Sequence, residues 1–180
     1  MIDFDSFPTI ETKNLLLRKM DQDDAQDFFE MRSNPRMNVY TDSKVDENIA
    51  ETKSYIDKMN KGVDDRKWLI WAIEHNLSKK VIGSISIWNL KQEDVSGELG
   101  YGIIPDFQGQ GFMKESLLSV IDYAFEEMKL NKLFAYTEEE NENSIKLLEK
   151  SGFAEINRVD EPNKDNTRLY RMVVYRLERP

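Results

Sequence analysis

Apolar and polar residues alternate or recur along this chain in a way that predicts seven strands and four helices. Short alternating runs bounded by turn residues are typical of strands, and apolar residues that recur every three or four positions are typical of helices. The expected helices run from 21–24 to a break at Asn34-Pro35, over 45–60, from the glycines near 110 to about 128, and from Asn141 onward. The expected strands cover residues 15–20, 67–74, 81–90, 95–104, 133–137, 152–158 and 167–177.

The order of these elements indicates one mixed α/β domain over residues 1–180. A helix lies between strands 95–104 and 133–137, and a crossover helix joins parallel strands, so these two are expected to be parallel. We therefore expect a mixed seven-stranded sheet with helices on both faces. At 180 residues the chain can bury a core of its own, and no internal repeat or low-complexity linker divides it.

The charge balance limits the kinds of partner that this chain can have. Its formal net charge is −9 with 33% charged residues, which argues against binding to the phosphate backbone of DNA or RNA. The same charge favours cationic or amine-bearing substrates by electrostatic steering, although solubility alone also explains it. No apolar run reaches membrane-spanning length and no signal segment is evident, so we expect a cytoplasmic protein without a membrane partner.

Metal and thiol chemistry find no support in the composition. The chain has no cysteine and a single histidine, His75, which excludes disulfides, thiolate metal ligands and a cysteine nucleophile. His75 lies in a polar turn with Asn76 and Ser78, where we expect a solvated side chain and no catalytic role. No metal site is expected.

The stretch that organises the chain is SGELGYGIIPDFQGQGFMK, residues 96–114. A strand runs into a short loop with Gly109 and Gly111 and then into a helix. This arrangement presents free backbone N–H groups, at the positive end of a helix dipole, to an anion. The glycine spacing matches neither the dinucleotide fingerprint nor the nucleoside-triphosphate loop. Two interpretations stay open at this point, an anion-binding loop and a tight turn that caps a helix.

Three polar residues near this loop are candidates for chemistry. Asn141 and Ser144 open the helix of NENSIKLLEKSGF (141–153), where helix capping is an alternative explanation for both. In strand 95–104, Glu98 shares a face with Gly100 and Gly102, and the glycines leave room for a ligand there. The opposite face carries Val95, Leu99, Tyr101 and Ile103. From the residues alone, a solvated glutamate at a sheet edge is the simpler explanation of Glu98.

These motifs resemble those of a known family. QGQGFM (108–113) resembles the pyrophosphate loop of the GNAT N-acetyltransferases, and NENS with LLEKSGF resembles the helix and strand entry that follow it. GELGYGI (97–103) and LLLRKMDQDDAQDFFEM (15–31) resemble more narrowly the ribosomal-protein N-terminal acetyltransferases. The resemblance covers nearly the whole chain. Two positions depart from the pattern: Met113 stands where glycine or alanine is usual, and Leu148 stands where many relatives have a tyrosine.

The resemblance implies a GNAT-like single domain with a mostly antiparallel sheet, and it assigns roles to particular residues. Glu98 becomes the candidate general base, and Ser144 becomes the candidate acid for the departing thiolate in place of the missing tyrosine. Main-chain groups at Ile103 and Ile104, with the side chain of Asn141, are expected to hold the pantetheine arm of acetyl-CoA. The pyrophosphate is expected at the backbone amides of Gln108, Gly109, Gln110, Gly111, Phe112 and Met113.

The function implied is acetyl-CoA-dependent acetylation of a primary amine. A protein or peptide N-terminus is the leading acceptor, because an α-amine with a pKa near 7.7–8.0 costs only about 1–1.4 kcal/mol to deprotonate at pH 7, against about 4–5 kcal/mol for a lysine-like amine. The alternatives are a small amine (a polyamine, an amino acid or an aminoglycoside) and a non-catalytic acyl-CoA-binding sensor. In the resemblance, the first two helices and loop 36–44 wall the acceptor, and a homodimer is common.

Overall fold

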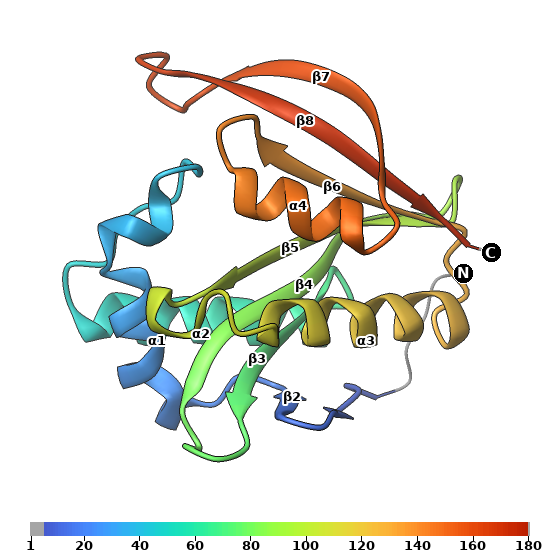
Figure 1. Ribbon diagram of the computed structural model, residues 1–180. Coiled ribbons are helices and arrows are strands. Elements are labelled where there is room, and N and C mark those ends of the chain that lie inside the picture. Colours follow the sequence, from blue (N-terminus) through green and yellow to red (C-terminus); the bar gives the residue numbers. More distant parts are fainter. Residues whose placement is uncertain (1–5, 180) are drawn as a thin grey trace.

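The strands of the computed structural model, which describes residues 6–179, form one sheet in the order β1-β2-β3-β4-β5-β6-β8-β7 (Figure 1). Among the described strands only β5 and β6 pair in parallel, which confirms the predicted mixed, mostly antiparallel sheet. Within the described residues the sheet has eight strands, one more than expected. The strands are β1 (Ile10–Glu11), β2 (Leu15–Arg18), β3 (Leu69–His75), β4 (Val81–Lys91), β5 (Ser96–Ile103), β6 (Lys132–Glu138), β7 (Ala154–Pro162) and β8 (Leu169–Glu178).

The additional strand, β1, is a two-residue edge strand. Ile10 pairs with Leu17 and Glu11 with Leu16 of the neighbouring β2. Two residues are too few to show an alternating pattern, so the sequence carries no periodic signal for this strand.

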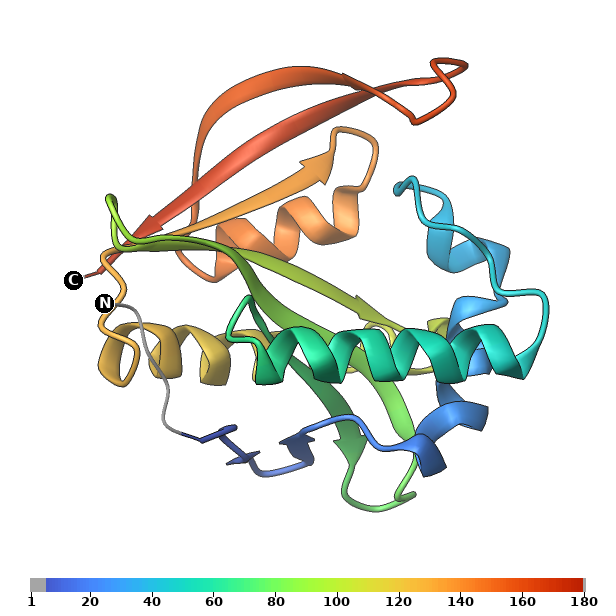
Figure 2. The same cartoon turned by 180° about the vertical axis from the view of Figure 1, so that it is seen from behind.

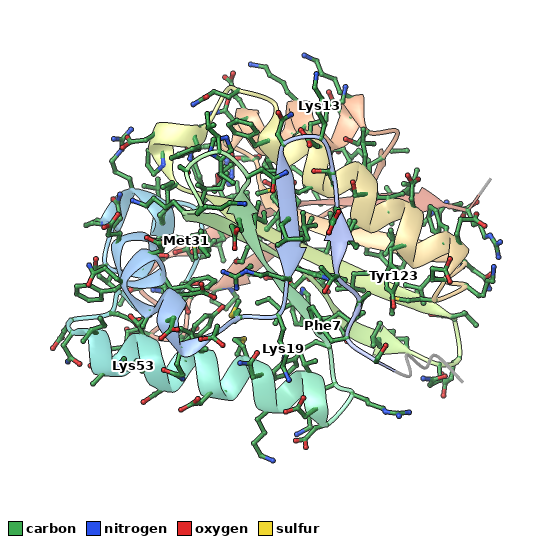
Figure 3. All side chains as sticks on the ribbon, turned by 90° about the horizontal axis from the view of Figure 1, so that it is seen from below. Phe7, Lys13, Lys19, Met31, Lys53 and Tyr123 are labelled. Carbon is green, nitrogen blue, oxygen red and sulfur yellow. The ribbon has the colours of Figure 1, made fainter. Side chains whose placement is uncertain are left out.

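The helices lie on both faces of the sheet, as expected (Figures 1 and 2). Two of them, α3 and α4, cover one face, and α1 and α2 cover the other. Figure 3, seen from the β1–β2 edge, shows α2 and α3 on opposite sides of the strands. In Figure 2, α2 does not extend over β7 and β8. The helices are α1 (Ala25–Arg32), α2 (Ile49–Asp64), α3 (Phe112–Glu126) and α4 (Glu142–Lys150), with short 3₁₀ turns at Gln22–Asp24, Pro35–Asn38 and Pro105–Phe107.

Helix α2 is shifted by four residues relative to the prediction of 45–60. Its N-cap is Asn48, whose side-chain oxygen accepts hydrogen bonds from the amides of Ala50 and Glu51. It continues through Gly62, where a Cβ atom would clash with the ring of Trp68. Within the helix, Gly62 therefore makes room for an indole ring.

The last hairpin is longer than predicted. Its pairing extends to Pro162 and Leu169, so the strand expected over 152–158 continues to Pro162 and the connection is 163–168. Pro162 ends an edge strand, a place where a missing N–H is tolerated. In Figure 1 the tip of this hairpin extends toward the segment between α1 and α2.

The core fills the space between the sheet and its helices. Trp71, Tyr175 and Phe28 are its largest fully buried side chains. Trp71 packs against Tyr123 of α3 in an edge-on arrangement and against Phe7. Figure 3 labels these two partners, Phe7 and Tyr123. Among the described residues, no helix is long and apolar enough to cross a membrane.

The parallel pair β5–β6 separates halfway along its length, and this separation positions the site. The two strands pair from Ser96 with Lys132 to Leu99 with Ala135, and beyond this point β6 pairs only with β8. Ile104 donates its amide to Ile82, so its main-chain groups face β4. Main-chain groups alternate in direction along a strand, so those of Tyr101 and Ile103 face the gap that opens between β5 and β6. The gap therefore offers main-chain donors and acceptors to an extended ligand.

Glu115 ties the start of α3 to the turn between β1 and β2. Its carboxylate accepts hydrogen bonds from Thr12 Oγ1 (2.6 Å), the amide of Asn14 (2.8 Å) and Asn14 Nδ2 (2.8 Å). Burial raises the pKa of this carboxyl, but the hydrogen bonds from Asn14 and Thr12 together lower it by more, so that its pKa lies below the usual value. The stabilisation of the fold by these hydrogen bonds to the Glu115 carboxylate is therefore present above the unfolded-state pKa and is lost as the pH falls through the folded-state pKa.

We expect Glu115→Gln to lower the free energy of unfolding by about 1–3 kcal/mol at pH 7, because it removes charge-assisted hydrogen bonds. Urea unfolding at pH 7 and below pH 4 measures this, and the difference between variant and wild type should shrink at the lower pH. Glu126→Gln, on the same helix with one 3.8 Å ion pair to Arg179, is the control and should change little. An equal loss in both variants would contradict the assignment.

Candidate active site

The glycine loop adopts a conformation that only glycine tolerates well. Gly109 and Gly111 have φ angles of +72° and +88°, in the left-handed region that disfavours other residues. No described atom lies within 4 Å of a Cβ atom built at either position, so the space beside both glycines is open. Gly111 is also the N-cap of α3 and has no side-chain cap, which leaves the first-turn amides without a local side-chain acceptor.

These amides face a cleft of about 530 Å³ that we name the loop cleft; it lies between β5, the loop at 107–113 and the start of α4. Its wall includes Gly109, Gly111, Phe112 and Met113. Four basic residues also line it: Arg36, Lys114, Lys146 and Lys150. A positive cleft in a chain of net charge −9, built on free amides at a helix start, fits a phosphate-bearing ligand. The sequence prediction had not assigned these basic residues.

Gln108 and Gln110 support the loop from within. Gln108 donates through Nε2 to the carbonyl of Ile103 (3.0 Å), and Gln110 donates through Nε2 to the carbonyl of Asp106 (2.8 Å). Of these two, Gln108 lines the loop cleft. Their side chains therefore hold the loop in shape, and any contact of theirs with an anion would come from the main chain.

The two isoleucines predicted to hold the pantetheine arm differ in their position. Ile103 lines the loop cleft and its main chain faces the gap between β5 and β6. Ile104 donates its amide to Ile82 and accepts through its carbonyl from the amide of Phe107. The structure thus places Ile103, with Tyr101, at the ligand gap and turns the main chain of Ile104 into the sheet and the following turn.

Asn141 and Ser144 begin α4 on the other side of the gap, and both line the loop cleft. Asn141 Oδ1 accepts from the amide of Ser144 (3.2 Å), so the predicted capping role is present. The cap uses the oxygen of the Asn141 amide group and leaves its Nδ2 as a donor. Capping and ligand contact are therefore compatible at this residue.

Ser144 forms a pair with a residue that the sequence did not single out. Its Oγ lies 2.8 Å from the hydroxyl of Tyr101 on β5, and both side chains line the loop cleft. Burial raises the pKa of Tyr101 to about 12, against the smaller opposing effect of the hydrogen bond with Ser144. The phenol stays protonated over the working pH range and is a hydrogen-bond donor.

Glu98 lies on the opposite face of β5 from Tyr101, together with Gly100 and Gly102. Burial raises the pKa of its carboxyl, whereas the 3.2 Å hydrogen bond from Asn89 Nδ2 lowers it and the charge of Glu161 raises it. Glu98 is not among the residues that line either cavity described here. It is two residues, about 7 Å along a strand, from Gly100, which lines the second of these cavities.

His75 is not the solvated side chain that the sequence predicted. Its ring is half-buried and packs on two phenylalanines, with ring centroids 5.4 Å from Phe107 and 5.0 Å from Phe112. Its Nδ1 lies 2.9 Å from Ser78 Oγ. The loop 76–80 places this histidine against the outside of the glycine loop, a long-range contact that a turn-like local sequence does not reveal.

A second cavity meets the loop cleft on the Gly100 and Gly102 side of β5. It has a volume of about 230 Å³, and we name it the Asn38 cavity after one of its lining residues. The two cavities share Met37, Thr41, Tyr101 and Gly102. A donor group in the loop cleft and an acceptor molecule in the Asn38 cavity would therefore meet beside Gly102.

The β7–β8 hairpin forms hydrogen bonds with segment 39–44, which contributes lining residues to both cavities. Lys164 donates its amide to Asp42 Oδ2 (2.9 Å), Arg168 donates to the carbonyl of Val39 (3.1 Å), and Tyr170 donates to the carbonyl of Thr41 (3.2 Å). Segment 39–44 is thus anchored from the far end of the sheet.

Comparison with known proteins places this site in a family. The family model described as acetyltransferase (GNAT) domain matches residues 14–154. The uncharacterized N-acetyltransferase YoaA of Bacillus subtilis is 30% identical over 174 residues, which are 97% of this chain and 98% of that protein. The spermidine N(1)-acetyltransferase of Vibrio cholerae is 24% identical over 141 residues, 78% of this chain and 79% of that protein.

Solved structures show the same architecture. The ribosomal-protein-S5-alanine acetyltransferase of Vibrio fischeri superposes with a TM-score of 0.82 at 19% identity, covering 95% of this chain and 96% of that one. The spermidine N-acetyltransferase of Vibrio cholerae, in complex with CoA and spermine, gives 0.79 at 23% identity, covering 93% and 96%. At these identities the likeness shows the fold alone. With the family match and the glycine loop, it follows that this chain belongs to the GNAT acetyltransferases and is an acetyl-CoA-dependent N-acetyltransferase.

Proposed function

We propose that this enzyme acetylates the α-amine of a protein or peptide N-terminus. The observation that carries the proposal is the absence of acidic side chains at the reaction centre: among residues 6–179, no aspartate or glutamate lines the loop cleft or the Asn38 cavity. A polyamine, with several amines of high pKa, would be expected to meet carboxylates there. An α-amine costs little to deprotonate, so a carboxylate that acts from outside the cavities through a water molecule is a sufficient base for it.

The chain's own residues divide the work between the two cavities. The amides of Gly111, Phe112 and Met113, with Lys114, would bind the pyrophosphate, and the main chain of Ile103 with Asn141 Nδ2 would align the pantetheine arm. When bound, acetyl-CoA supplies a thioester carbonyl for the amine to attack and a thiolate that leaves. Positioning of the two reactants can account for much of the acceleration.

Proton transfer would use the two faces of β5. Glu98, through a water molecule, would accept a proton from the acceptor amine. The hydroxyls of Tyr101 and Ser144 would donate a hydrogen bond to the departing thiolate. Tyr101 thereby takes the place of the family tyrosine that Leu148 replaces.

We expect Tyr101→Phe to reduce kcat by about 10- to 100-fold, because it removes one hydrogen-bond donor for the developing thiolate. The dissociation constant of acetyl-CoA should stay within about twofold, since the ring and the fold of β5 are kept. Steady-state rates with saturating acetyl-CoA and calorimetric titration separate the two quantities. Loss of affinity with an unchanged kcat would show that the hydroxyl binds the ligand and takes no part in thiolate departure.

The test of the proposed function is a calorimetric titration with acetyl-CoA followed by a thiol-release screen over peptide N-termini, polyamines, amino acids and aminoglycosides. Turnover of peptide α-amines above the others supports the proposal. Turnover of polyamines or aminoglycosides alone would replace it by a small-amine function, which the acidic net charge also suits. Tight binding of acetyl-CoA with no turnover on any amine would indicate an acyl-CoA sensor.

A further inference from the structure

Two aromatic side chains stay exposed on the sheet face that carries Glu98. Trp88 of β4 and Tyr136 of β6 are 43% and 39% exposed. Trp88 stands directly opposite Glu98 in the pairing of β4 with β5. Phe134, two residues before Tyr136, pairs with Glu98 in the neighbouring β6. Residues in register, or two apart on one strand, point to the same side of a sheet, so Trp88, Glu98 and Tyr136 share one face.

The helices leave this end of the face open. Helices α1 and α2 lie on this side of the sheet, but α2 does not extend over β7 and β8 (Figure 2). Exposed aromatic side chains that gather on one face indicate an interaction surface, whereas singly scattered ones do not.

Glu161 of the β7–β8 hairpin adds a negative charge to this face. Tyr136 pairs with Val174 of β8, and Val174 pairs with Asn157 of β7. Glu161 is four residues beyond Asn157 on the same strand and therefore points to the same side. Burial is the main cause that raises the pKa of Glu98 and that of Tyr136, and the charge of Glu161 also raises both. We name Trp88, Glu98, Tyr136 and Glu161 the exposed strip.

The exposed strip continues the walls of the two cavities at two places. A Cβ atom built on Gly100, which lines the Asn38 cavity, would lie 3.6 Å from Nε1 of Trp88. Glu161 pairs with Tyr170, whose hydroxyl donates to the carbonyl of Thr41 (3.2 Å). Thr41 lines both cavities. A polypeptide whose first residue occupies the Asn38 cavity can therefore continue over the exposed strip.

The charges of the exposed strip suit a cationic side chain. An aromatic ring attracts a cation to its face, and a carboxylate beside it supplies the opposite charge. Within residues 6–179 the carboxylate of Glu161 has no hydrogen bond or ion pair. Lys91 has the smallest of the effects on the pKa of Glu98, and Arg176, on the same face, is paired with Glu178 (3.2 Å). The strip therefore keeps a negative charge that no neighbouring cation neutralises.

We propose that the exposed strip binds a basic side chain of the acceptor polypeptide, at the third to fifth residue from the acetylated N-terminus. The inference rests on the proposed function and adds a sequence preference to it. Glu98, which stands opposite Trp88, is four residues from Gly102, or about 13 Å along a strand. An extended peptide whose amine lies beside Gly102 covers this distance in about four residues, and fewer when a long side chain reaches ahead.

The test compares four acceptors: three heptapeptide amides that begin with alanine and carry arginine, glutamine or glutamate at the fourth position, and spermidine. Arginine is chosen because lysine would bring a second amine that can be acetylated. The wild-type enzyme should prefer the arginine peptide to the glutamine peptide by about 3- to 30-fold in kcat/KM, the range of one ion pair with one cation–π contact. The glutamate peptide should be the poorest, and the preference should shrink as salt is added.

Two substitutions with the same change of net charge separate the exposed strip from the overall charge of the protein. Glu161→Lys should abolish or reverse the preference, while kcat/KM for the glutamine peptide stays within about twofold on the plateau of the pH profile. Asp160→Lys is the matched control, because Asp160 is the preceding residue of β7, is exposed and points to the opposite face. General steering by a net charge of −9 would respond equally to both substitutions.

Two further measurements complete the test. Trp88→Leu keeps an apolar side chain, removes the ring and should reduce the preference by about two- to fivefold. Calorimetric titration of the arginine peptide into the CoA-saturated protein should show a loss of affinity in Glu161→Lys and none in Asp160→Lys. Equal use of the arginine and glutamine peptides, or an equal effect of the two lysine substitutions, overturns the inference and leaves the proposed function standing. Turnover of spermidine with none of any peptide overturns the proposed function itself, and the inference with it.

Discussion

Replacing Gly111 by alanine should weaken acetyl-CoA binding by about 100-fold or more, which corresponds to the loss of about two charge-assisted hydrogen bonds. At a φ angle of +88° a Cβ atom is strained, and relief of that strain turns the amides of Phe112 and Met113 away from the loop cleft. The open space beside Gly111 shows that no protein contact requires a glycine here. The requirement is the backbone conformation that aims the amides.

The control for this variant is a glycine with the same strain elsewhere. Gly152, which follows α4, has a φ angle of +91° and lines neither cavity. Gly152→Ala should cost a similar amount of stability and leave acetyl-CoA binding unchanged. Thermal unfolding and calorimetric titration of both variants measure the two effects. If Gly111→Ala binds acetyl-CoA as tightly as the wild type, the loop is only a turn and the cofactor lies elsewhere.

The glycine loop could be predicted from the sequence because its determinants are local. Gly109, Gly111 and the helix that follows are within a few residues of each other, and the φ preference of glycine is a property of a single residue. The parallel direction of β5 and β6 followed from the crossover helix between them.

The partners of the site residues could not be predicted, because they come from distant parts of the chain. Tyr101 and Ser144 are 43 positions apart, and the hydroxyl contact depends on where β5 and β6 separate. The alternating pattern placed Tyr101 on a face of the strand but could not show that α4 begins opposite it. The motif GELGY contained the tyrosine, and the pattern alone gave it no chemical role.

The same limit explains His75 and the Asn38 cavity. The polar neighbours of His75 suggested a solvated turn, whereas Phe107 and Phe112 reach its ring from the glycine loop. Asn38 shows as an ordinary loop asparagine until the fold buries its amide nitrogen beside Arg32. Burial and unpaired donors are properties of the folded chain, and local sequence patterns do not encode them.

Replacing Glu98 by glutamine should reduce kcat/KM by about 100- to 1,000-fold, the range typical of losing a general base. Glutamine keeps the volume and the hydrogen bond with Asn89 but cannot accept a proton. Burial raises the pKa of Glu98, so as the pH is lowered the wild-type enzyme should lose activity at a higher pH than it would with an ordinary glutamate. This acidic limb of the pH–rate profile should be absent in the variant. The measurement is kcat/KM against pH with a peptide acceptor.

Two neighbouring substitutions separate a catalytic carboxylate from a structural one. Asn89→Ala removes the hydrogen bond that lowers the pKa of Glu98, so the acidic limb should move to higher pH while the plateau rate is kept. Glu161→Gln removes a nearby charge that raises this pKa, and should move the limb the other way without lowering the plateau. A structural carboxylate would change stability in these variants and leave the limb where it is. If Glu98→Gln retains the wild-type rate at every pH, the acceptor amine loses its proton to water before it binds, and positioning by the two cavities carries the reaction.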